Sequence, residues 1–329
     1  MTRIAINGFG RIGRTLCRVL QSYPTIEIVA INDLAGVDNL AHLLKYDSIH
    51  GRFPLQVSHA QKTLLVGENS IEVLMESDPL KLPWRDLNID IVIEATGHFR
   101  STAQAKKHID AGAKKVIISA PAADEETKTI VLGVNDHLLD GTETIISNAS
   151  CTTNSAAPLI KVLQEHWQIE QAYITTVHSY TSDQRLHDAP HKDWRRGRAA
   201  AQSIVPTTTG AAKALTRIFP DLSGRLGGAG IRVPVPNGSL TDLSCMLGEE
   251  VSLNDLNAAF KQAAEGKLKG ILEYTSDPIV SIDIIDNPHS SIFDSQLTSA
   301  MGRMIKVVGW YDNEWGYSNR LAELIVKVA

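Results

Sequence analysis

The amino-acid sequence predicts an α/β domain followed by a separate α+β domain. Three observations lead to this prediction. The chain of 329 residues is longer than one ordinary hydrophobic core accommodates. Short apolar strands alternate with helical patterns through residues 1–149, which is typical of a parallel sheet. From about residue 170 longer strands follow outside that rhythm, which indicates a mixed or antiparallel sheet.

The first predicted strand leads into a glycine-rich loop. A β-prone run at 3–6 is followed by a helical pattern that begins near Thr15. Between them Gly8, Gly10 and Gly13 fit the pattern G-x-G-x-x-G, which allows a tight turn, close approach of a pyrophosphate and close helix packing. The helix N-terminus supplies an anion site. Taken alone, the glycine triplet is also compatible with a simple tight turn.

An acidic residue at the end of the next strand strengthens this interpretation. The strand at 26–31 is followed by Asp33, which lies twenty residues after Gly13. An acid in this position accepts hydrogen bonds from the adenosine ribose hydroxyls and repels a 2′-phosphate, which favours NAD over NADP. NADP use at lower efficiency remains open.

The alternation continues with a strand at 89–95, a helix at 102–111 and a strand at 115–119. Ligands of doubly wound parallel sheets bind beyond the carboxyl ends of the strands. The residues that fall at such ends are Gly8, Asp33, Thr96, Gly97 and Ser119. We therefore predict a Rossmann-type, doubly wound dinucleotide-binding domain over residues 1–149.

The second half of the chain contains β-branched strands and one long irregular segment. A polar stretch at 179–203 lacks periodicity, and loops of this length are usually functional or disordered. Its histidines, arginines and tryptophan favour a packed binding loop. A helix at 253–264 is introduced by Ser252, and a helical pattern covers 318–326. Strands are predicted at 172–178, 231–235 and 239–246.

Composition excludes several classes of function. The chain is 43% hydrophobic and 21% charged, as in ordinary soluble proteins, and its net charge is −5. We predict no specific nucleic-acid binding, because the short basic cluster Arg195–Arg198 is more typical of a solvated face or an anion contact. No apolar run has the length of a membrane span, and the first strand leaves no room for a signal peptide.

The three cysteines, Cys17, Cys151 and Cys245, are an odd number and lie far apart in the sequence. No metal-binding spacing is present, and a reducing compartment fits this pattern. We therefore expect a cytoplasmic protein without a bound metal.

Cys151 is the candidate nucleophile. A strand-like run at 142–146 precedes it, and a helical pattern follows at 156–166. A thiol in the first turn of a helix feels the positive end of the helix dipole, which favours the thiolate. A small buried hydrophobic residue is the alternative, but the flanking hydroxyl residues favour a reactive thiol.

A reactive thiol and a nicotinamide site in one chain imply aldehyde oxidation through a thioester. The reaction needs a base, and His178, at the end of a predicted strand, is the best candidate among eleven histidines. A structural histidine is the alternative. Sequence spacing does not show whether His178 and Cys151 meet in space.

Five segments closely resemble phosphorylating glyceraldehyde-3-phosphate dehydrogenase: 7–14 (NGFGRIGR), 150–154 (SCTTN), 176–181 (TVHSYT), 191–196 (HKDWRR) and 310–317 (WYDNEWGY). The resemblance runs from residue 3 to the C-terminus. It implies a catalytic domain at 150–313 on a mixed or antiparallel sheet. It also implies that 314–329 returns to the NAD-binding domain, and that the loop 179–203 lies at a subunit interface of a homotetramer.

The resemblance further implies roles for individual residues. Cys151 would be the nucleophile, and His178 would activate it and assist hydride transfer. The substrate phosphate would be held by Thr181, Arg196 and Arg232, although structural ion pairs are the alternative for the two arginines. Inorganic phosphate would bind near Ser150, Thr152, Thr209 and Gly210. NAD would contact Arg11, Ile12, Asp33, Ser119, Asn313 and Tyr317.

Some positions depart from the family pattern. Ser155 replaces a second cysteine, which leaves Cys151 as the only thiol there. Ser77 replaces an arginine, which puts one cofactor contact in doubt, and Gly309 replaces a serine without clear consequence. Leu34 and Pro190 stand where NADP-using relatives tend to carry small hydroxyl residues, which agrees with NAD.

The implied function is oxidation and phosphorylation of D-glyceraldehyde 3-phosphate to 1,3-bisphosphoglycerate with reduction of NAD. Erythrose-4-phosphate dehydrogenase is the nearest alternative, but its relatives usually lack the pair Tyr180–Thr181 and the run Thr208–Ala212. A non-phosphorylating enzyme is another. A non-catalytic scaffold on the same fold is the third, and the intact Cys151, His178 and Arg232 argue against it. The direction of the reaction in the cell, glycolytic or gluconeogenic, remains open.

Overall fold

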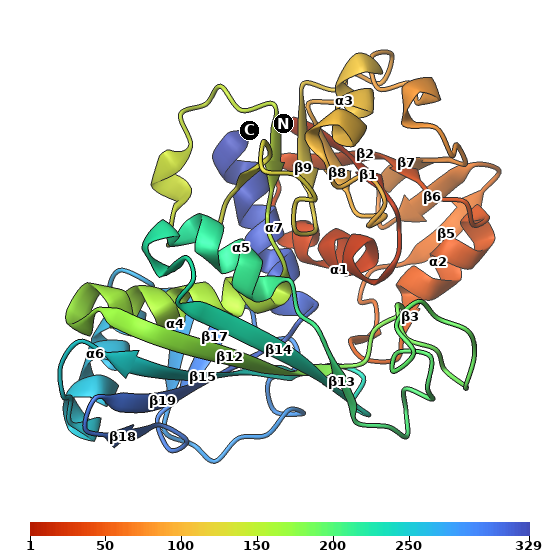
Figure 1. Cartoon of the computed structure of the whole chain (residues 1–329). Coiled ribbons are helices and arrows are strands. Elements are labelled where there is room, and N and C mark those ends of the chain that lie inside the picture. Colours follow the sequence, from red (N-terminus) through yellow and green to blue (C-terminus); the bar gives the residue numbers. More distant parts are fainter. The chain divides into compact units, whose positions relative to one another are not determined.

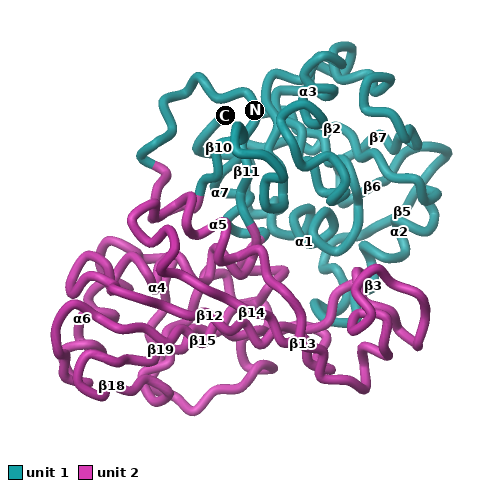
Figure 2. The backbone as a smooth tube through the Cα atoms, in the orientation of Figure 1, with its two compact units in different colours: residues 1–130, 137–149, 318–329 teal, residues 131–136, 150–317 magenta.

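The computed structural model describes all 329 residues, which form two compact units (Figures 1 and 2). Unit 1 comprises Met1–Ile130, His137–Ala149 and Ser318–Ala329, and unit 2 comprises Val131–Asp136 and Ser150–Tyr317. Each unit is built around its own extended sheet.

Unit 1 contains a nine-stranded sheet in the order β10-β11-β9-β8-β1-β2-β7-β6-β5. All pairs from β10 to β7 are parallel, which confirms the predicted doubly wound parallel sheet. The edge β7-β6-β5 is antiparallel and was not predicted. The strands are β1 (Thr2–Asn7), β2 (Ile26–Asn32), β5 (Val57–Ala60), β6 (Thr63–Val66), β7 (Asn69–Leu74), β8 (Ile91–Glu94), β9 (Lys115–Ile118), β10 (Lys128–Thr129) and β11 (Ile145–Ser147).

The helices of this unit follow the strands as the alternation predicts. They are α1 (Arg11–Val19), α2 (Val37–Lys45), α3 (Thr102–Asp110) and α7 (Trp315–Val328), whose residues from Ser318 belong to unit 1. A short hairpin of β3 (Tyr46–Asp47) and β4 (Gly51–Arg52) follows α2. At the start of α3, Ser101 and Gln104 form a capping box. A cluster of fully buried side chains around Trp84 packs the β8 and β9 side of the sheet against α3.

Unit 2 contains an eight-stranded mixed sheet, as predicted, in the order β13-β14-β12-β15-β19-β17-β16, with β18 paired to β19. The pairs β12-β14 and β16-β17 are parallel, and the others are antiparallel. The strands are β12 (Ile169–Ser179), β13 (Val205–Thr207), β14 (Leu226–Val233), β15 (Ser239–Leu247), β16 (Leu272–Thr275), β17 (Ser291–Asp294), β18 (Ser299–Met301) and β19 (Met304–Tyr311).

Three helices accompany this sheet: α4 (Cys151–Trp167), α5 (Ala211–Ile218) and α6 (Leu253–Glu265). α4 packs against strands β12, β15, β17 and β19, and also contacts α5 and α6. Its residues from Thr152 to Ile160 are buried, which explains the run of small and apolar side chains there. Ser252 caps α6 as predicted, because its hydroxyl accepts from the Asp255 backbone N–H at 3.1 Å.

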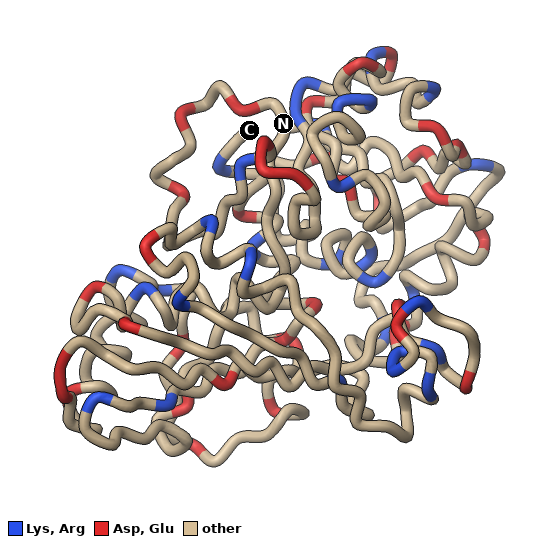
Figure 3. Tube along the Cα trace, viewed as in Figure 1, with Lys and Arg blue, Asp and Glu red and all other residues tan.

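The segment between β12 and β13 contains turns and bends but no helix or strand, in agreement with the irregular loop predicted at 179–203. Figure 3 shows lysines and arginines interleaved with acidic residues in both units, consistent with the net charge of −5. None of the helices combines the length and the apolar composition needed to cross a bilayer.

Candidate active site

Cys151 is the first residue of α4, so its thiol lies in the first turn of a helix, as the sequence predicts. Ser150 is the N-cap residue, and its hydroxyl accepts a hydrogen bond from the Thr153 backbone N–H at 3.1 Å. The Ser150 carbonyl accepts from the Asn154 N–H at 2.9 Å and closes the first turn. Unpaired backbone N–H groups and the helix dipole favour a negative charge at such a position.

His178 lies next to this thiol. Its Nε2 atom is 3.4 Å from Cys151 Sγ, although the two residues are 27 positions apart in the sequence. The imidazole is buried near the end of β12, whereas the Cys151 side chain is half-buried. A thiol and a ring nitrogen at this distance can exchange a proton directly.

The other ring nitrogen of His178 has two competing partners. Nδ1 is 2.7 Å from the Ser179 carbonyl oxygen and 2.7 Å from Nη1 of Arg232. The carbonyl can only accept and the guanidinium can only donate, so each partner selects a different tautomer. A proton on Nδ1 leaves Nε2 free to accept the thiol proton, whereas an unprotonated Nδ1 places the proton on Nε2, facing the sulfur. The surroundings of Nδ1 therefore accommodate either neutral tautomer of His178.

Burial and the neighbouring positive charge of Arg232 shift the pKa values of both His178 and Cys151. Burial, together with the Arg232 guanidinium, lowers the pKa of His178 to about 3, so the imidazole is neutral at physiological pH. Burial raises the pKa of the Cys151 thiol, while Arg232 and the N–H and hydroxyl of Thr152 act in the opposite direction. Arg232 therefore favours a negative sulfur and disfavours a positive imidazole.

Strand register sets the position of Arg232. In the parallel pair β12-β14, His178 lies directly opposite Arg232. The guanidinium also donates to the Ser179 carbonyl at 3.0 Å, which fixes it beside the imidazole. The structure thus brings Arg232 to the Cys151–His178 pair.

Tyr311, which the sequence analysis did not single out, is part of the same site. Its hydroxyl is 3.0 Å from the Thr152 hydroxyl and 2.8 Å from the Thr176 hydroxyl, and its ring meets His178 edge-on at 6.0 Å. Burial raises the pKa of Tyr311, so the phenol stays protonated. Only its place in the segment 310–317 could have indicated this role.

Arg196 is held by several groups of its own. Its guanidinium pairs with Asp183 and donates to the Thr207 hydroxyl at 3.0 Å and the Thr208 carbonyl at 3.3 Å. An ion pair, one of the two alternatives weighed for this residue, is thus present. These bonds connect the 179–203 loop to the end of β13 and the residue that follows it.

The remaining residues expected to bind phosphate lie on two other segments. Gly210 is the exposed N-cap of α5, and the Thr209 hydroxyl accepts from the Ala211 N–H at 3.2 Å. Thr181 is half-buried at the start of the loop, where its carbonyl accepts from the Gln184 N–H at 2.9 Å. These residues belong to unit 2, as do Cys151 and His178.

In unit 1 the glycine-rich loop after β1 has the shape that a dinucleotide needs. Gly8 has a φ of +95°, and a Cβ there would lie 2.7 Å from the Thr96 nitrogen. A Cβ on Gly13 would lie 2.3 Å from the Gly8 carbonyl oxygen, whereas one on Gly10 would meet nothing within 4 Å. Gly8 and Gly13 thus allow the chain to pack, and Gly10 leaves open space at the N-terminus of α1. The residues present therefore fit a pyrophosphate.

Asp33 follows β2 and is oriented by two backbone groups. Oδ2 accepts from the Phe9 N–H at 2.7 Å, and Oδ1 accepts from the Ala35 N–H at 2.9 Å. Each oxygen keeps acceptor capacity for a ribose hydroxyl. Arg11, in the first turn of α1 next to Ile12, forms an ion pair with Asp47 that holds its side chain.

The loops after β8 and β9 complete the carboxyl edge of this sheet. Both the N–H and the hydroxyl of Thr96 donate to Oε1 of Glu94, and Gly97 has a φ of +75°. Ser119 follows β9, and its N–H donates to the Glu94 carbonyl at 2.9 Å. The structure thus places Thr96, Gly97 and Ser119 at strand ends of one sheet, together with Gly8 and Asp33.

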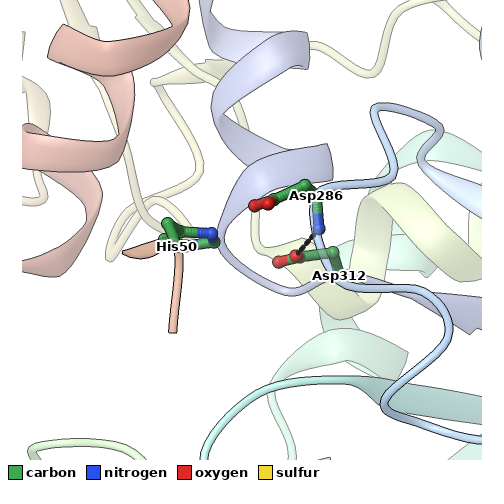
Figure 4. A group of neighbouring side chains, drawn as sticks. All are labelled: His50, Asp286 and Asp312. Carbon is green, nitrogen blue, oxygen red and sulfur yellow. Dashed lines mark hydrogen bonds between the residues drawn. The ribbon is translucent and has the colours of Figure 1, made fainter. Parts of the chain in front are cut away.

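Asn313 and Tyr317 lie in unit 2, on the turn that enters α7 and on its first turn. The Asn313 carboxamide oxygen accepts from the hydroxyls of Ser179 at 2.9 Å and Ser239 at 2.7 Å. The buried Asp312 carboxylate shapes this turn by accepting from four N–H groups. The donors are the backbones of Asp286 (Figure 4), Glu314 and Trp315 and the side chain of Asn237.

Comparisons with known proteins agree over the whole chain. The family model described as glyceraldehyde 3-phosphate dehydrogenase, NAD binding domain, matches residues 2–102, and the model of the C-terminal domain matches residues 150–313. Glyceraldehyde-3-phosphate dehydrogenase of Mycobacterium avium is 57% identical over 333 residues, covering 99% of this chain and 98% of the relative. The relative from Mycolicibacterium smegmatis is 55% identical over 334 residues, with the same coverage. Glyceraldehyde-3-phosphate dehydrogenase 2 of Streptomyces avermitilis is 55% identical over 329 residues, again with the same coverage.

Proposed function

This chain belongs to the glyceraldehyde-3-phosphate dehydrogenase family, and we propose that Cys151 is the nucleophile and His178 the base of its reaction. The enzyme oxidises and phosphorylates D-glyceraldehyde 3-phosphate to 1,3-bisphosphoglycerate with NAD as cofactor. The observation that carries the residue assignment is the 3.4 Å separation of Cys151 Sγ and His178 Nε2, beside the Arg232 guanidinium.

The first half of the reaction forms a covalent adduct. His178 Nε2 takes the proton of the Cys151 thiol, and the thiolate adds to the aldehyde carbon. The carbonyl electron pair becomes an alkoxide, which takes that proton from Nε2. Nε2 then accepts the hydroxyl proton as the carbon loses hydride and a thioester forms. NAD, when bound, supplies the hydride acceptor.

The second half releases the product. An oxygen of inorganic phosphate attacks the thioester carbon, the C–S bond breaks, and Cys151 leaves as a thiolate. His178 is neutral at rest and becomes an imidazolium each time Nε2 takes up a proton. Its low pKa favours the return of that proton, so the charged form is short-lived.

We assign the two anions of the reaction to hydroxyl, arginine and helix-start groups. Helix starts at α4 and α5 support this assignment, because backbone N–H groups there favour phosphate. Arg196 would exchange its ion pair with Asp183 for the substrate. The substrate phosphate is assigned to Thr181, Arg196 and Arg232, and inorganic phosphate to Ser150, Thr152, Thr209 and Gly210.

Cofactor binding is assigned to the domain 1–149 with 314–329, and catalysis to 150–313. The open space at Gly10 supports binding of a dinucleotide pyrophosphate. The oriented carboxylate of Asp33 supports NAD rather than NADP, because a carboxylate repels a 2′-phosphate. The assigned contacts are Gly8, Gly10, Arg11, Ile12, Gly13, Asp33, Thr96, Gly97, Ser119 and Asn313, with Tyr317 near the nicotinamide.

We further propose a cytoplasmic homotetramer. The irregular loop 179–203 exposes large apolar side chains, with Trp194 at 88% and Leu186 at 71%, which suits a subunit interface. The three cysteines are unpaired, which suits a reducing compartment. Analytical ultracentrifugation would measure a monomer if the interface assignment is wrong.

NAD reduction with D-glyceraldehyde 3-phosphate, with and without inorganic phosphate, tests the reaction. We expect turnover to require phosphate and Cys151→Ala to abolish it. A rate independent of phosphate would indicate a non-phosphorylating enzyme. Much higher efficiency on erythrose 4-phosphate would favour that substrate instead.

A further inference from the structure

Glu94, at the end of β8, is a buried carboxylate that accepts hydrogen bonds from four donors. It is 1% exposed. Oε1 accepts from the Thr96 backbone N–H at 2.9 Å and from the Thr96 hydroxyl, and Oε2 accepts from the Asn7 side chain at 2.6 Å and from His108 Nε2 at 3.1 Å. A buried carboxylate without hydrogen-bond partners costs free energy. The four donors offset that cost only when the Glu94 side chain adopts this one orientation.

The proton position on His108 follows from its second partner. Nε1 of Trp84, which can only donate, lies 3.0 Å from His108 Nδ1. Nδ1 is therefore the acceptor, and a neutral ring carries its proton on Nε2, directed at Glu94. His108 and Trp84 are both completely buried, so water does not compete for these bonds.

From Glu94 the hydrogen-bond network also continues through Asn7, across the carboxyl ends of the neighbouring strands. The Asn7 carboxamide oxygen accepts from the Asn32 side chain at 2.7 Å. The backbone of Glu76, just after β7, then orients Asn32, with its N–H donating to Asn32 Oδ1 and its carbonyl accepting from Nδ2. The backbone N–H of Glu76 can only donate and its carbonyl can only accept, so together they fix the amide orientation of Asn32. Asn32 in turn fixes the amide orientation of Asn7.

Glu94 joins the two loops that meet at Gly8. Asn7 is the last residue of β1 and directly precedes Gly8, and Thr96 belongs to the loop after β8. The Gly8 backbone already packs so closely on Thr96 that a Cβ there would lie 2.7 Å from the Thr96 nitrogen. The Glu94 carboxylate therefore fixes the distance between the loop after β1 and the loop after β8.

We propose that Glu94, held by the Trp84–His108 pair, is a positioning residue that preorganises the dinucleotide loops for NAD. This inference rests on the proposed placement of NAD at the glycine-rich loop. Glutamine at position 94 keeps the shape but replaces one acceptor oxygen by an NH₂ group. That group would face the donors Asn7 Nδ2 and His108 Nε2, or the two donors of Thr96, and either mismatch displaces a loop.

The test measures NAD dissociation constants by calorimetry for the full-length protein and for Glu94→Gln, with apo-protein melting temperatures recorded alongside. We expect at least tenfold weaker NAD binding in Glu94→Gln at temperatures where the variant is folded. The matched control is Asp90→Asn, just before the same strand, whose carboxylate binds the Arg3 N–H and Lys114. This control should change the NAD dissociation constant by less than twofold.

A second variant, Trp84→Phe, keeps an aromatic ring but removes the donor to His108 Nδ1. ¹⁵N NMR should show the Nε2–H tautomer of His108 in both proteins, with a shifted Nδ1 resonance in the variant because Nδ1 loses its hydrogen bond, and NAD binding should be several-fold weaker. A parent protein that fails to bind NAD would contradict the proposed function. A parent that binds NAD, with Glu94→Gln within twofold of it or no weaker than Asp90→Asn, would overturn this inference alone.

Discussion

Replacing Arg232 by glutamine removes the positive charge beside the catalytic pair and tests its electrostatic role. Arg232 Nη1 is 2.7 Å from His178 Nδ1, and His178 Nε2 is 3.4 Å from Cys151 Sγ, with the imidazole ring between them. For a charge separation of about 8 Å and an effective dielectric constant of about 20, Coulomb's law gives roughly 2 kcal/mol. This corresponds to about a 30-fold smaller thiolate population below the thiol pKa.

Alkylation by iodoacetamide, a neutral reagent, measures this population without substrate. Cys151 should be the only thiol that reacts, because Cys17 and Cys245 are buried with pKa values raised to about 12, whereas Cys151 is only half-buried and lies beside Arg232. We expect the second-order alkylation rate constant of Arg232→Gln at pH 7 to fall roughly 30-fold. Arg232→Lys keeps the charge and should retain most of the rate.

Two controls separate this effect from a general perturbation. Arg225→Gln removes a cation of the same unit that binds the Asp221 carbonyl, and it should leave the rate unchanged. The Arg232→Gln effect should also persist in a His178→Asn background, where the base no longer contributes. An alkylation rate within twofold of the parent would refute the electrostatic role of Arg232.

Three further predictions concern packing, pH and hydrogen bonding. Gly10→Ala should fold normally but lose NAD affinity, whereas Gly13→Ala, whose Cβ would lie 2.3 Å from the Gly8 oxygen, should lower the melting temperature; equal stability of the two variants would contradict this. The folded-state pKa of His178, about 3, lies below its ordinary value of 6.5, so its contribution to stability is complete above pH 6.5 and is lost as the pH falls toward 3. Between pH 6.5 and pH 5 the unfolding free energy of the parent, measured in urea, should therefore fall by roughly 1.6 kcal/mol more than that of His178→Asn, and parallel pH curves would argue against the low pKa. Tyr311→Phe should cost about 1–2 kcal/mol of unfolding free energy, because Thr152 and Thr176 lose a buried partner; an unchanged denaturation midpoint would contradict that contact.

Local patterns were sufficient to predict the parallel sheet of unit 1 and the position of Cys151 in a helical first turn. Glycine spacing, strand periodicity and helix-start residues act over a few positions, so the sequence reports them directly. The antiparallel edge β5-β6-β7 was missed because its short strands break the alternation of strands and helices. The helix pattern began at residue 156 rather than 151, because the hydroxyl residues of the first turn hide its periodicity.

The remaining features depend on tertiary placement. Tyr311 and Glu94 carry no sequence signal of their own roles, since Tyr311 bonds to Thr152 and Thr176 and Glu94 bonds to Asn7 and His108, all of them distant in the sequence. The distance between Cys151 and His178 is likewise set by how α4 packs on the unit 2 sheet. Resemblance to a family suggested the pairing, but only coordinates give the competing partners at Nδ1.

The parallel pairing of β12 with β14 has a consequence for how this enzyme can diversify. Parallel neighbours need a long crossover, and here that crossover contains the loop 179–203, β13 and α5. His178 stands at the exit of the crossover's first strand, and Arg232 stands near the end of the strand to which it returns. Insertions and deletions between them can therefore change assembly or substrate contacts while the backbone ladder keeps base and cation side by side. The surface formed by the crossover can therefore change during evolution without a change in the residues that carry the proton chemistry.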